Sequence, residues 1–187
     1  MIWKSLLQSK EIWEVNVNKR NIILVGFMGT GKSTVGMTLA ERLGWAFVDT
    51  DQYIEGKHRK SIPELFREQG EAFFRAAESE ALREMLSGEG RILATGGGAV
   101  LAAENREMMQ NNGFVIALRA APDIIIRRVS EDQNRPLLQG NLEERVHSIM
   151  EQRKHAYDFA DISIDTSGLS VSEITERILK ATGLLKS

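Results

Sequence analysis

The stretch NIILVGFMGTGKST, residues 21–34, determines the fold of this chain. Residues 21–25 are mostly apolar and partly β-branched, as expected of a buried strand. Residues 26–33 match the pattern G-x-x-x-x-G-K-[ST]. In that pattern glycines let backbone N–H groups curl around phosphate oxygens, and the following helix adds its positive N-terminal end. The stretch therefore predicts a strand, a phosphate-binding loop and a helix, in that order.

The residues of this loop have separate tasks in binding a nucleotide. Lys32 is expected to reach the outer phosphates, and the Ser33 hydroxyl can bind Mg²⁺. We therefore expect ATP and Mg²⁺ as cofactors. The cofactor-binding residues expected in the loop and the first turn of the helix are Gly29, Thr30, Gly31, Lys32, Ser33 and Thr34.

Outward from this stretch, strand patterns alternate with helix patterns. Further strand patterns lie at residues 45–51, 91–95, 114–119 and 162–165. One helix pattern follows the loop up to residue 43, and a second begins at residue 61. Further helix patterns lie at residues 71–86, 103–110, 122–128, 142–157 and 172–180. This alternation predicts an α/β fold, with a parallel sheet and helices on both faces. Ligands in such sheets bind beyond the carboxyl ends of the strands, where the candidate motifs lie.

Length and composition narrow the class of protein. A chain of 187 residues with 42% hydrophobic residues suits one domain with a buried core. A formal net charge of -2 argues against a nucleic-acid binder. The absence of cysteine excludes disulfides and thiolate metal sites, and it fits a cytoplasmic protein. No apolar run reaches the roughly 18 residues that a membrane span requires, so we expect no membrane partner.

Two segments differ from the rest of the chain. Residues 1–20 lack a signal peptide's long apolar stretch and are interpreted as a loosely ordered N-terminal extension before a single domain at 21–187. Residues 130–141 are polar and form a connection longer than most, which is typical of a mobile or functional loop.

A phosphate loop leaves several functions open. The chain could be a kinase for a small molecule, a GTP switch or an ATPase that drives a partner's motion. A GTP switch is expected to carry an N-K-x-D motif and an ABC-type ATPase an L-S-G-G-Q-like signature, and the chain has neither. Its small size favours the kinase.

Two aspartates, Asp49 and Asp51, close the second strand pattern. In an extended segment alternate residues point the same way, so both carboxylates are expected on one face. One can assist Mg²⁺, and the other can accept a hydrogen bond from an acceptor hydroxyl and its proton.

Three arginines are candidates for binding anions. Arg75 has Glu78 at i+3, a spacing at which an ion pair can orient it on a helix. Arg153 has Tyr157 at i+4, and Arg135 lies in the polar loop. Arginine forks match carboxylates and phosphates bidentately, so these side chains suit an anionic substrate.

Together these motifs resemble the shikimate kinase family. GFMGTGKST, DTD, FR followed by Glu78, GGGAV, RPLL and RxxxY occur in the family's order over roughly residues 21–170. The resemblance implies a three-layer P-loop kinase fold with a five-stranded parallel sheet and a mobile lid, at about 130–141. It also implies a commonly monomeric enzyme that uses ATP to phosphorylate shikimate at its 3-hydroxyl, giving shikimate 3-phosphate and ADP. That step leads toward chorismate and the aromatic amino acids.

The resemblance also implies residue roles on the nucleotide side. Lys32 would hold the phosphates, and Ser33 would bind Mg²⁺, with Asp49 acting through water. Arg135 would move with the lid onto the transferring phosphate. Arg128 would flank the adenine on one side, and the turn after Asp165 would line the other.

On the acceptor side, the resemblance implies that Asp51 holds the hydroxyls of shikimate next to the reacting oxygen. Arg75 and Arg153 would grip its carboxylate, and Glu78 would orient Arg75. The catalytic residues expected are thus Lys32, Asp51 and Arg135.

The triple glycine Gly96, Gly97 and Gly98 is a second glycine loop without the Lys-Ser of a phosphate site. In the family this run lies under the acceptor. Glycine lets the backbone approach the acceptor ring, so we expect these three residues to bind substrate. A side chain at Gly97 or Gly98 would intrude on the space of the acceptor. A tight strand-to-helix turn would explain one glycine and not readily all three.

Other functions remain open from the residues. A gluconate-like or nucleoside-monophosphate kinase would share the first loop and differ at DTD and GGG. A catalytically inactive ATP-binding regulatory module is a further alternative, against which the intact Lys32, Ser33, Asp51 and Arg135 argue.

Overall fold

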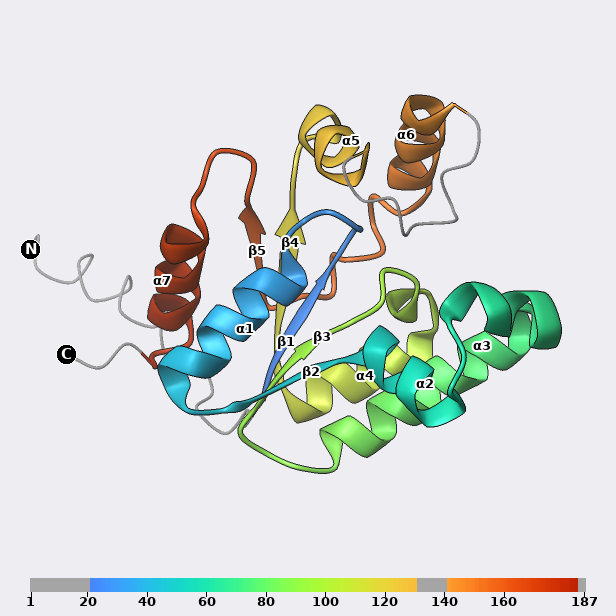
Figure 1. Cartoon of the computed structure of the whole chain (residues 1–187). Coiled ribbons are helices and arrows are strands. Elements are labelled where there is room, and N and C mark those ends of the chain that lie inside the picture. The colour runs from blue at the N-terminus through green and yellow to red at the C-terminus, as the bar shows by residue number, and fades with distance from the viewer. Residues whose placement is uncertain (1–20, 131–140, 185–187) are drawn as a thin grey trace, which may run out of the picture.

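Five parallel strands form the centre of the molecule (Figure 1). They lie in the order β2-β3-β1-β4-β5, which confirms the predicted parallel sheet and its five strands. Because β1 is central, each of its residues is buried, and its sequence is a continuous apolar run after the first residue. The strands are β1 (Asn21–Gly26), β2 (Ala46–Asp49), β3 (Arg91–Ala94), β4 (Phe114–Arg119) and β5 (Ile162–Asp165).

The structure, a computed structural model, describes residues 21–130 and 141–184. The predicted N-terminal extension, residues 1–20, lies outside the described residues. The same holds for residues 131–140, which include Arg135 and nearly all of the predicted lid.

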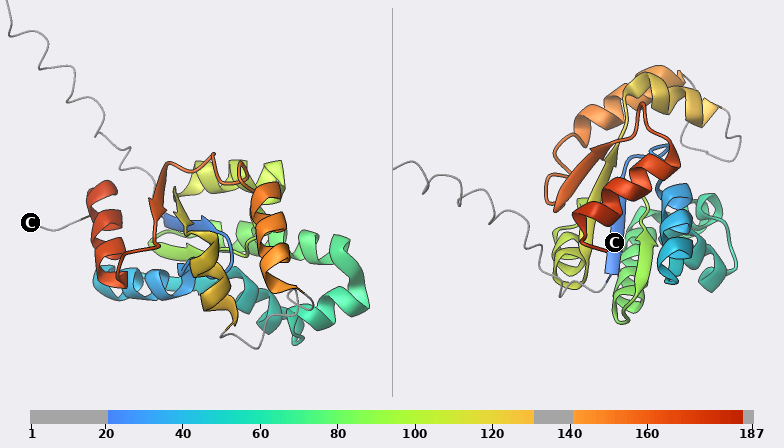
Figure 2. Two further views of the ribbon diagram at one scale, coloured as in Figure 1. Left: turned by 90° about the horizontal axis from the view of Figure 1, so that it is seen from above. Right: turned by 90° about the vertical axis from the view of Figure 1, so that its left-hand side faces the viewer.

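Helices cover both faces of the sheet and complete three layers (Figure 2). The side chains of β1 divide between the two faces: Ile22 and Leu24 pack with α1 and α7, whereas Ile23 and Val25 pack with α2, α3 and α4. The first pair of helices is α1 (Lys32–Leu43) and α7 (Val171–Ala181). The second group is α2 (Thr50–His58), α3 (Ile62–Leu86) and α4 (Ala103–Asn112).

Two further helices, α5 (Pro122–Ser130) and α6 (Leu142–Gln152), pack against each other beyond the carboxyl end of β4 (Figure 1). Their small apolar cluster joins Ile125 and Val129 of α5 to Val146 of α6 and to Phe27 in the phosphate loop. The loop that follows β1 is therefore packed directly against this pair.

Three predicted elements differ in detail. The second strand ends at Asp49, and helix α2, which the strand pattern did not predict, begins at once with Asp49 as its N-cap. The helix expected over 142–157 ends at Gln152, and Arg153 is its C-cap. The helices expected from 61 and from 71 form one element, α3, which is broken at Gly70 (φ 81°, ψ 173°).

Among the helices within residues 21–130 and 141–184, none is both long and apolar enough to cross a membrane.

Candidate active site

The phosphate loop connects β1 to α1, as predicted. Gly31 is the N-cap of α1 with a left-handed backbone, at φ 93°, and Gly29 has φ 75°. L-residues with a side chain rarely adopt this region, so these glycines allow the tight curl of the loop. The Lys32 ammonium lies back across the loop, where it donates to the carbonyl oxygens of Gly26 at 2.9 Å and Phe27 at 3.0 Å.

Arg128 and Thr166 join the phosphate loop to the carboxyl ends of β4 and β5. Arg128 Nη1 donates to the carbonyl of Gly29 at 3.0 Å and lies 3.4 Å from Thr166 Oγ1. The Thr166 side chain is fully buried, and its hydroxyl is 3.0 Å from the carbonyl oxygen of Arg119. The predicted adenine-flanking residues thus lie beside the loop, although their contact with a base stays a prediction.

The two carboxylate oxygens of Asp49 accept hydrogen bonds from different groups. Oδ2 accepts a hydrogen bond from Ser33 Oγ at 2.9 Å. Oδ1 accepts from the backbone N–H groups of Asp51 at 3.0 Å and Gln52 at 3.3 Å, which caps α2. The same side chain therefore closes the nucleotide side of the site and fixes the first turn of the helix that carries Asp51.

The pair formed by Ser33 and Asp49 fits Mg²⁺. A hydroxyl and a carboxylate in contact supply hard oxygen ligands, which this ion prefers. Nucleotide sites commonly hold Mg²⁺ by one or two protein oxygens together with phosphates and waters. In residues 21–130 and 141–184, no group of three or more His, Cys, Asp and Glu side chains could hold a metal by itself, so an all-protein cage is not the type of site seen here.

The expectation that Asp49 and Asp51 point the same way from a strand is wrong. Asp49 is extended, but Asp51 lies in the first turn of α2, so the two carboxylates serve different neighbours. An aspartate is among the best helix N-caps, and this local preference ends the strand two residues earlier than the strand pattern suggests. Asp49 turns to Ser33, and Asp51 turns to the triple glycine.

The triple glycine follows β3, beside the start of α2. The buried N–H of Gly96 donates to Thr50 Oγ1 at 2.8 Å. A Cβ added at Gly96 would lie 2.5 Å from Asp51 Oδ1 and 3.1 Å from Glu78 Oε1. A side chain at this position would therefore displace the Asp51 carboxylate.

Gly98 makes room for Arg75 in the same way. None of the three glycines has a positive φ, so backbone conformation does not require them. A Cβ at Gly98 would overlap the guanidinium of Arg75, whereas one at Gly97 would make only ordinary contacts, at 3.6 Å from both Arg153 Nη1 and Gly26 O. Collision with protein thus explains Gly96 and Gly98, whereas the intrusion of a side chain at Gly97 on the space of the acceptor stays a prediction.

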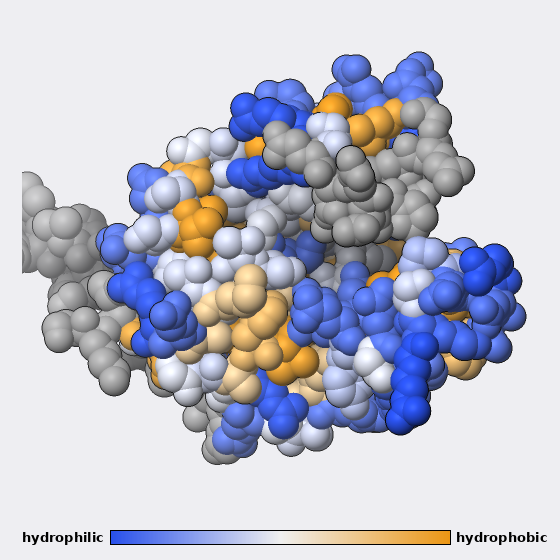
Figure 3. Space-filling model, in the orientation of Figure 1, coloured by the Kyte–Doolittle hydropathy of each residue, from blue (hydrophilic) through white to orange (hydrophobic). Residues whose placement is uncertain are grey.

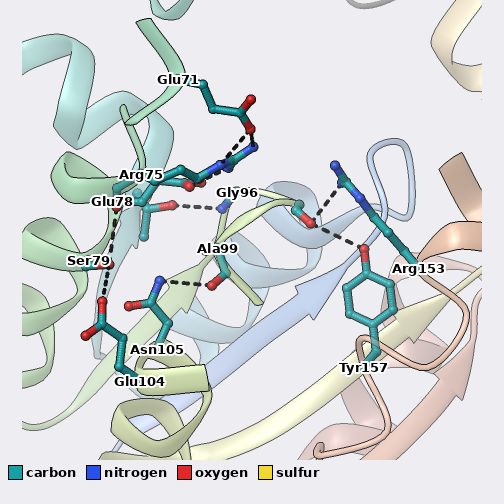
Figure 4. Close-up of polar contacts among 12 residues, drawn as sticks. Glu71, Arg75, Glu78, Ser79, Gly96, Ala99, Glu104, Asn105, Arg153 and Tyr157 are labelled. Atoms are coloured by element: carbon teal, nitrogen blue, oxygen red, sulfur yellow. Dashed lines mark hydrogen bonds and ion pairs between the residues drawn. The ribbon is translucent and has the colours of Figure 1, made fainter. Parts of the chain in front are cut away.

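Arg75 lies on α3 between two glutamates (Figure 4). Its Nη1 donates to Glu78 at 2.5 Å, and its Nε and Nη2 donate to Glu71 Oε1 at 3.3 and 3.1 Å. Glu78 has only 2% of its side chain exposed, whereas Glu71 has 69%. The predicted orientation of Arg75 by Glu78 agrees with this geometry.

The pKa values of this ion pair move for different reasons. Burial raises the pKa of Glu78 above its usual value, and the hydrogen bond and charge of Arg75 oppose that rise only in part. Burial lowers the pKa of Arg75, but the hydrogen bonds and charges of Glu78 and Glu71 outweigh it and raise the pKa overall. Arg75 keeps a third of its side chain in water, so it loses less hydration than Glu78 does.

Arg153 and Tyr157 converge on one carbonyl (Figure 4). Arg153 Nη1 donates to Gly97 O at 3.1 Å, and the Tyr157 hydroxyl lies 3.5 Å from the same oxygen. Burial raises the pKa of Tyr157, with Arg153 acting in the opposite direction, so this phenol stays protonated. The two residues are joined by turns after α6, not by the helical spacing that was expected.

The visible surface over α2 and α3 is mostly hydrophilic, and hydrophilic side chains also lie over α5 and α6 (Figure 3). Of the predicted site residues that the structure describes, several meet at the triple glycine, which lies against Gly26 of the phosphate loop and against Asp51, Arg75 and Arg153. Thr34 is exposed on α1.

Sequence reasoning did not identify Glu71 or Thr50 as site residues, and it predicted the turn after Asp165 without the contacts of Thr166 to other segments. Glu71 had a usable signal, since it lies four residues before Arg75 on a predicted helix. Thr50 and Thr166 had none, because each bonds to a segment far away in the sequence, Gly96 for Thr50 and Arg119 for Thr166.

Comparisons with known proteins agree with one another. The family model described as shikimate kinase matches residues 28–182. A shikimate kinase of Geobacter sulfurreducens is 44% identical over 169 residues, covering 89% of this chain and 93% of the relative. A structure titled shikimate kinase from Acinetobacter baumannii in complex with shikimate has a TM-score of 0.84 and 39% identity, covering 90% of this chain and 97% of that one. A gluconokinase from Sinorhizobium meliloti, at 14% identity and a TM-score of 0.55, shares the fold alone.

Proposed function

The chain belongs to the shikimate kinase family, and we propose that the site described above carries out the family's reaction with the residues named below. The reaction is the ATP-dependent phosphorylation of shikimate at its 3-hydroxyl, which gives shikimate 3-phosphate and ADP. It is a kinase step in the synthesis of chorismate and the aromatic amino acids.

One observation carries the assignment of roles. The triple glycine contacts the phosphate loop on one side, where a Cβ at Gly97 would lie 3.6 Å from Gly26 O. On its other side it contacts the Asp51 carboxylate and the Arg75 guanidinium. A polyhydroxy acid seated on this backbone would have its hydroxyls near a carboxylate, its own carboxylate near arginines, and a nucleotide phosphate within reach.

On the nucleotide side, the roles follow from the loop. Backbone N–H groups at the start of α1 would hold the phosphates, with the helix N-terminus adding its positive end. Lys32 would exchange its two backbone carbonyl partners for phosphate oxygens. We propose Mg²⁺ at Ser33 and Asp49, where it would neutralise charge on the phosphates; Asp49 would act through water.

On the acceptor side, Asp51 would accept a hydrogen bond from the 3-hydroxyl and take up its proton as the oxygen bonds to the γ-phosphorus and the bond to ADP breaks. Helix α2 positions this carboxylate, because Asp49 caps the first turn of the helix and the missing side chain of Gly96 leaves room for the carboxylate. Arg75 and Arg153 would bind the carboxylate of shikimate. Such positioning is the larger part of phosphoryl transfer, which needs little covalent work from protein.

Arg128 and Arg135 complete the proposed nucleotide contacts. Arg128, held on Gly29 and near Thr166, would flank the adenine. Arg135, which lies outside the described residues, would contact the transferring phosphate from the predicted lid at about 130–141. Closure over the site would exclude water, so that the phosphate passes to the acceptor and not to water.

We propose a single domain over residues 21–187 that acts as a cytoplasmic monomer, without nucleic-acid or membrane partners. The net charge of -2 and the absence of cysteine support this setting. Sedimentation velocity of the purified chain would test the monomer.

The central test is ADP release by the purified chain with Mg-ATP and each of shikimate, quinate, gluconate and a nucleoside monophosphate. We expect release that depends on shikimate. Release with gluconate and not with shikimate would contradict the assignment, and omission of Mg²⁺ in the presence of EDTA should stop the reaction.

A further inference from the structure

Two carboxylates hold Arg75, and they differ in how firmly they are placed. Glu78 contacts Nη1, is almost wholly buried and lies against Gly96. Glu71 contacts the opposite edge of the guanidinium, Nε and Nη2, and has 69% of its side chain exposed. Only Glu71 can leave without an unpaired carboxylate remaining in the interior.

The contacts of Arg75 with Glu71 are exposed, whereas its contact with Glu78 is partly buried. One oxygen of Glu71 accepts from both Nε and Nη2, so it occupies the edge of the guanidinium at which a ligand carboxylate could form two parallel hydrogen bonds. The other face of Arg75 is closed, because its guanidinium lies against Gly98 and near the Phe74 ring, 5.6 Å from the centroid. A ligand carboxylate must therefore use the edge that Glu71 already occupies or crowd beside it.

The charges make it unfavourable for Glu71 and a ligand carboxylate to bind Arg75 at the same time. Arg75 carries one positive charge and already contacts two carboxylates, so a third would add repulsion on a single cation. The contact with Glu71 is an exposed i,i+4 pair, which is weak in water, whereas a bidentate contact in a closed site is stronger. The exchange of one carboxylate for the other therefore favours the ligand.

We propose that Glu71 is an internal competitor for the acceptor: in the empty site its carboxylate occupies the edge of Arg75 that binds the carboxylate of shikimate, and it leaves when shikimate binds. This inference rests on the proposed function of Arg75. It assigns Glu71 a role opposite to that of Glu78, which stays on the arginine throughout.

The decisive variant is Glu71→Gln, measured by titration calorimetry of shikimate without nucleotide and by steady-state kinetics. Removal of the competitor should lower both the Kd and the KM for shikimate about two- to fivefold, with kcat and the KM for ATP little changed. The matched control is Glu80→Gln, a charge removed from the same helix where Glu80 pairs with Lys57 at 3.2 Å. It should leave the Kd for shikimate unchanged.

A second variant separates direct occupation from the general field of a negative charge. Glu71→Asp keeps the charge but is one methylene too short to hold both Nε and Nη2, so it should bind shikimate more tightly than the parent chain. If Glu71→Gln binds shikimate more tightly but Glu71→Asp has the affinity of the parent chain, then the negative charge at this position acts through its general field. The competitor role would then be wrong. An unchanged or raised Kd in Glu71→Gln, whether or not its Tm falls, would overturn the inference. Failure of the parent chain itself to bind shikimate would instead contradict the proposed function.

Discussion

The two glycine loops of this protein use the same residue for different physical reasons. In the phosphate loop, Gly31 has φ 93° and nothing lies within 4 Å of the place where its Cβ would be. At Gly98 the backbone is ordinary, with φ -96°, but a Cβ would overlap Arg75. Gly31 is thus needed for the path of its own backbone, whereas Gly98 is needed for a side chain that arrives from another element.

This difference matters for function. A loop that depends on its own backbone can bind phosphate in many proteins, as the phosphate loop does. A loop that depends on particular neighbours, here Asp51 and Arg75, is tied to one acceptor site. Under the proposed function we therefore expect the second loop to set the choice of acceptor, and variants that affect one loop should spare the ligand of the other.

The largest effect is expected from Asp51→Asn. The amide cannot take up a proton from the acceptor hydroxyl, so kcat should fall by about 10²–10⁴-fold. Because the Asp51 carboxylate lies against Gly96 of the second loop, the KM for ATP should change much less than kcat. Steady-state kinetics with both substrates measures this, and a variant that keeps most of its turnover would remove Asp51 from the mechanism.

Arg75→Ala should come next. Loss of one member of a charged, hydrogen-bonded set commonly weakens binding by 2–5 kcal/mol, so the KM for shikimate should rise on the order of a hundredfold. The KM for ATP should change far less, because Arg75 lies against Gly98 of the second loop and pairs with Glu71 and Glu78 on its own helix. Arg83→Ala, on the same helix, is the control. Equal losses for both substrates would place Arg75 outside the acceptor site.

A crossed pair of variants tests the comparison of the loops directly. Gly31→Ala forces a side chain into a left-handed backbone, which costs about 1–2 kcal/mol, so the KM for ATP should rise about five- to thirtyfold. Gly98→Ala instead displaces Arg75 and should raise the KM for shikimate about ten- to a hundredfold. Gly97→Ala should do less than Gly98→Ala. If both principal variants raised the same KM, the two loops would not be separable.

The smallest expected effect is the dependence of stability on pH that the Glu78 carboxyl causes. Burial raises the folded-state pKa of this carboxyl above its usual value of 4.5. Its contribution to stability is thus fully present below about 4.5 and is lost as pH rises through the raised folded-state pKa. In urea unfolding between pH 4 and 7, the parent chain should lose stability relative to Glu78→Gln, with a slope of at most about 1.4 kcal/mol per pH unit. If the difference in stability between the parent chain and Glu78→Gln did not depend on pH, burial would not be raising the pKa of Glu78.

The order of elements and the chemistry of the first loop could be predicted because both are local. A strand, a glycine loop and a helix within residues 21–43 depend on neighbours in the sequence, and the structure agrees with them. Helix α2 was missed because two signals compete at Asp49: alternation continues the strand, while a side-chain oxygen caps a helix. The cap prevails, since it satisfies backbone donors that the strand would leave open.

Spacing and residue type along the chain indicate the phosphate loop, the parallel sheet and the list of candidate residues. The need for glycine at Gly96 and Gly98 and the contact between Ser33 and Asp49 follow instead from the packing of segments that are distant in the sequence. Gly98 meets Arg75 because the turn after β3 packs on α3, and exclusion between residues that far apart in sequence leaves no periodic pattern to predict.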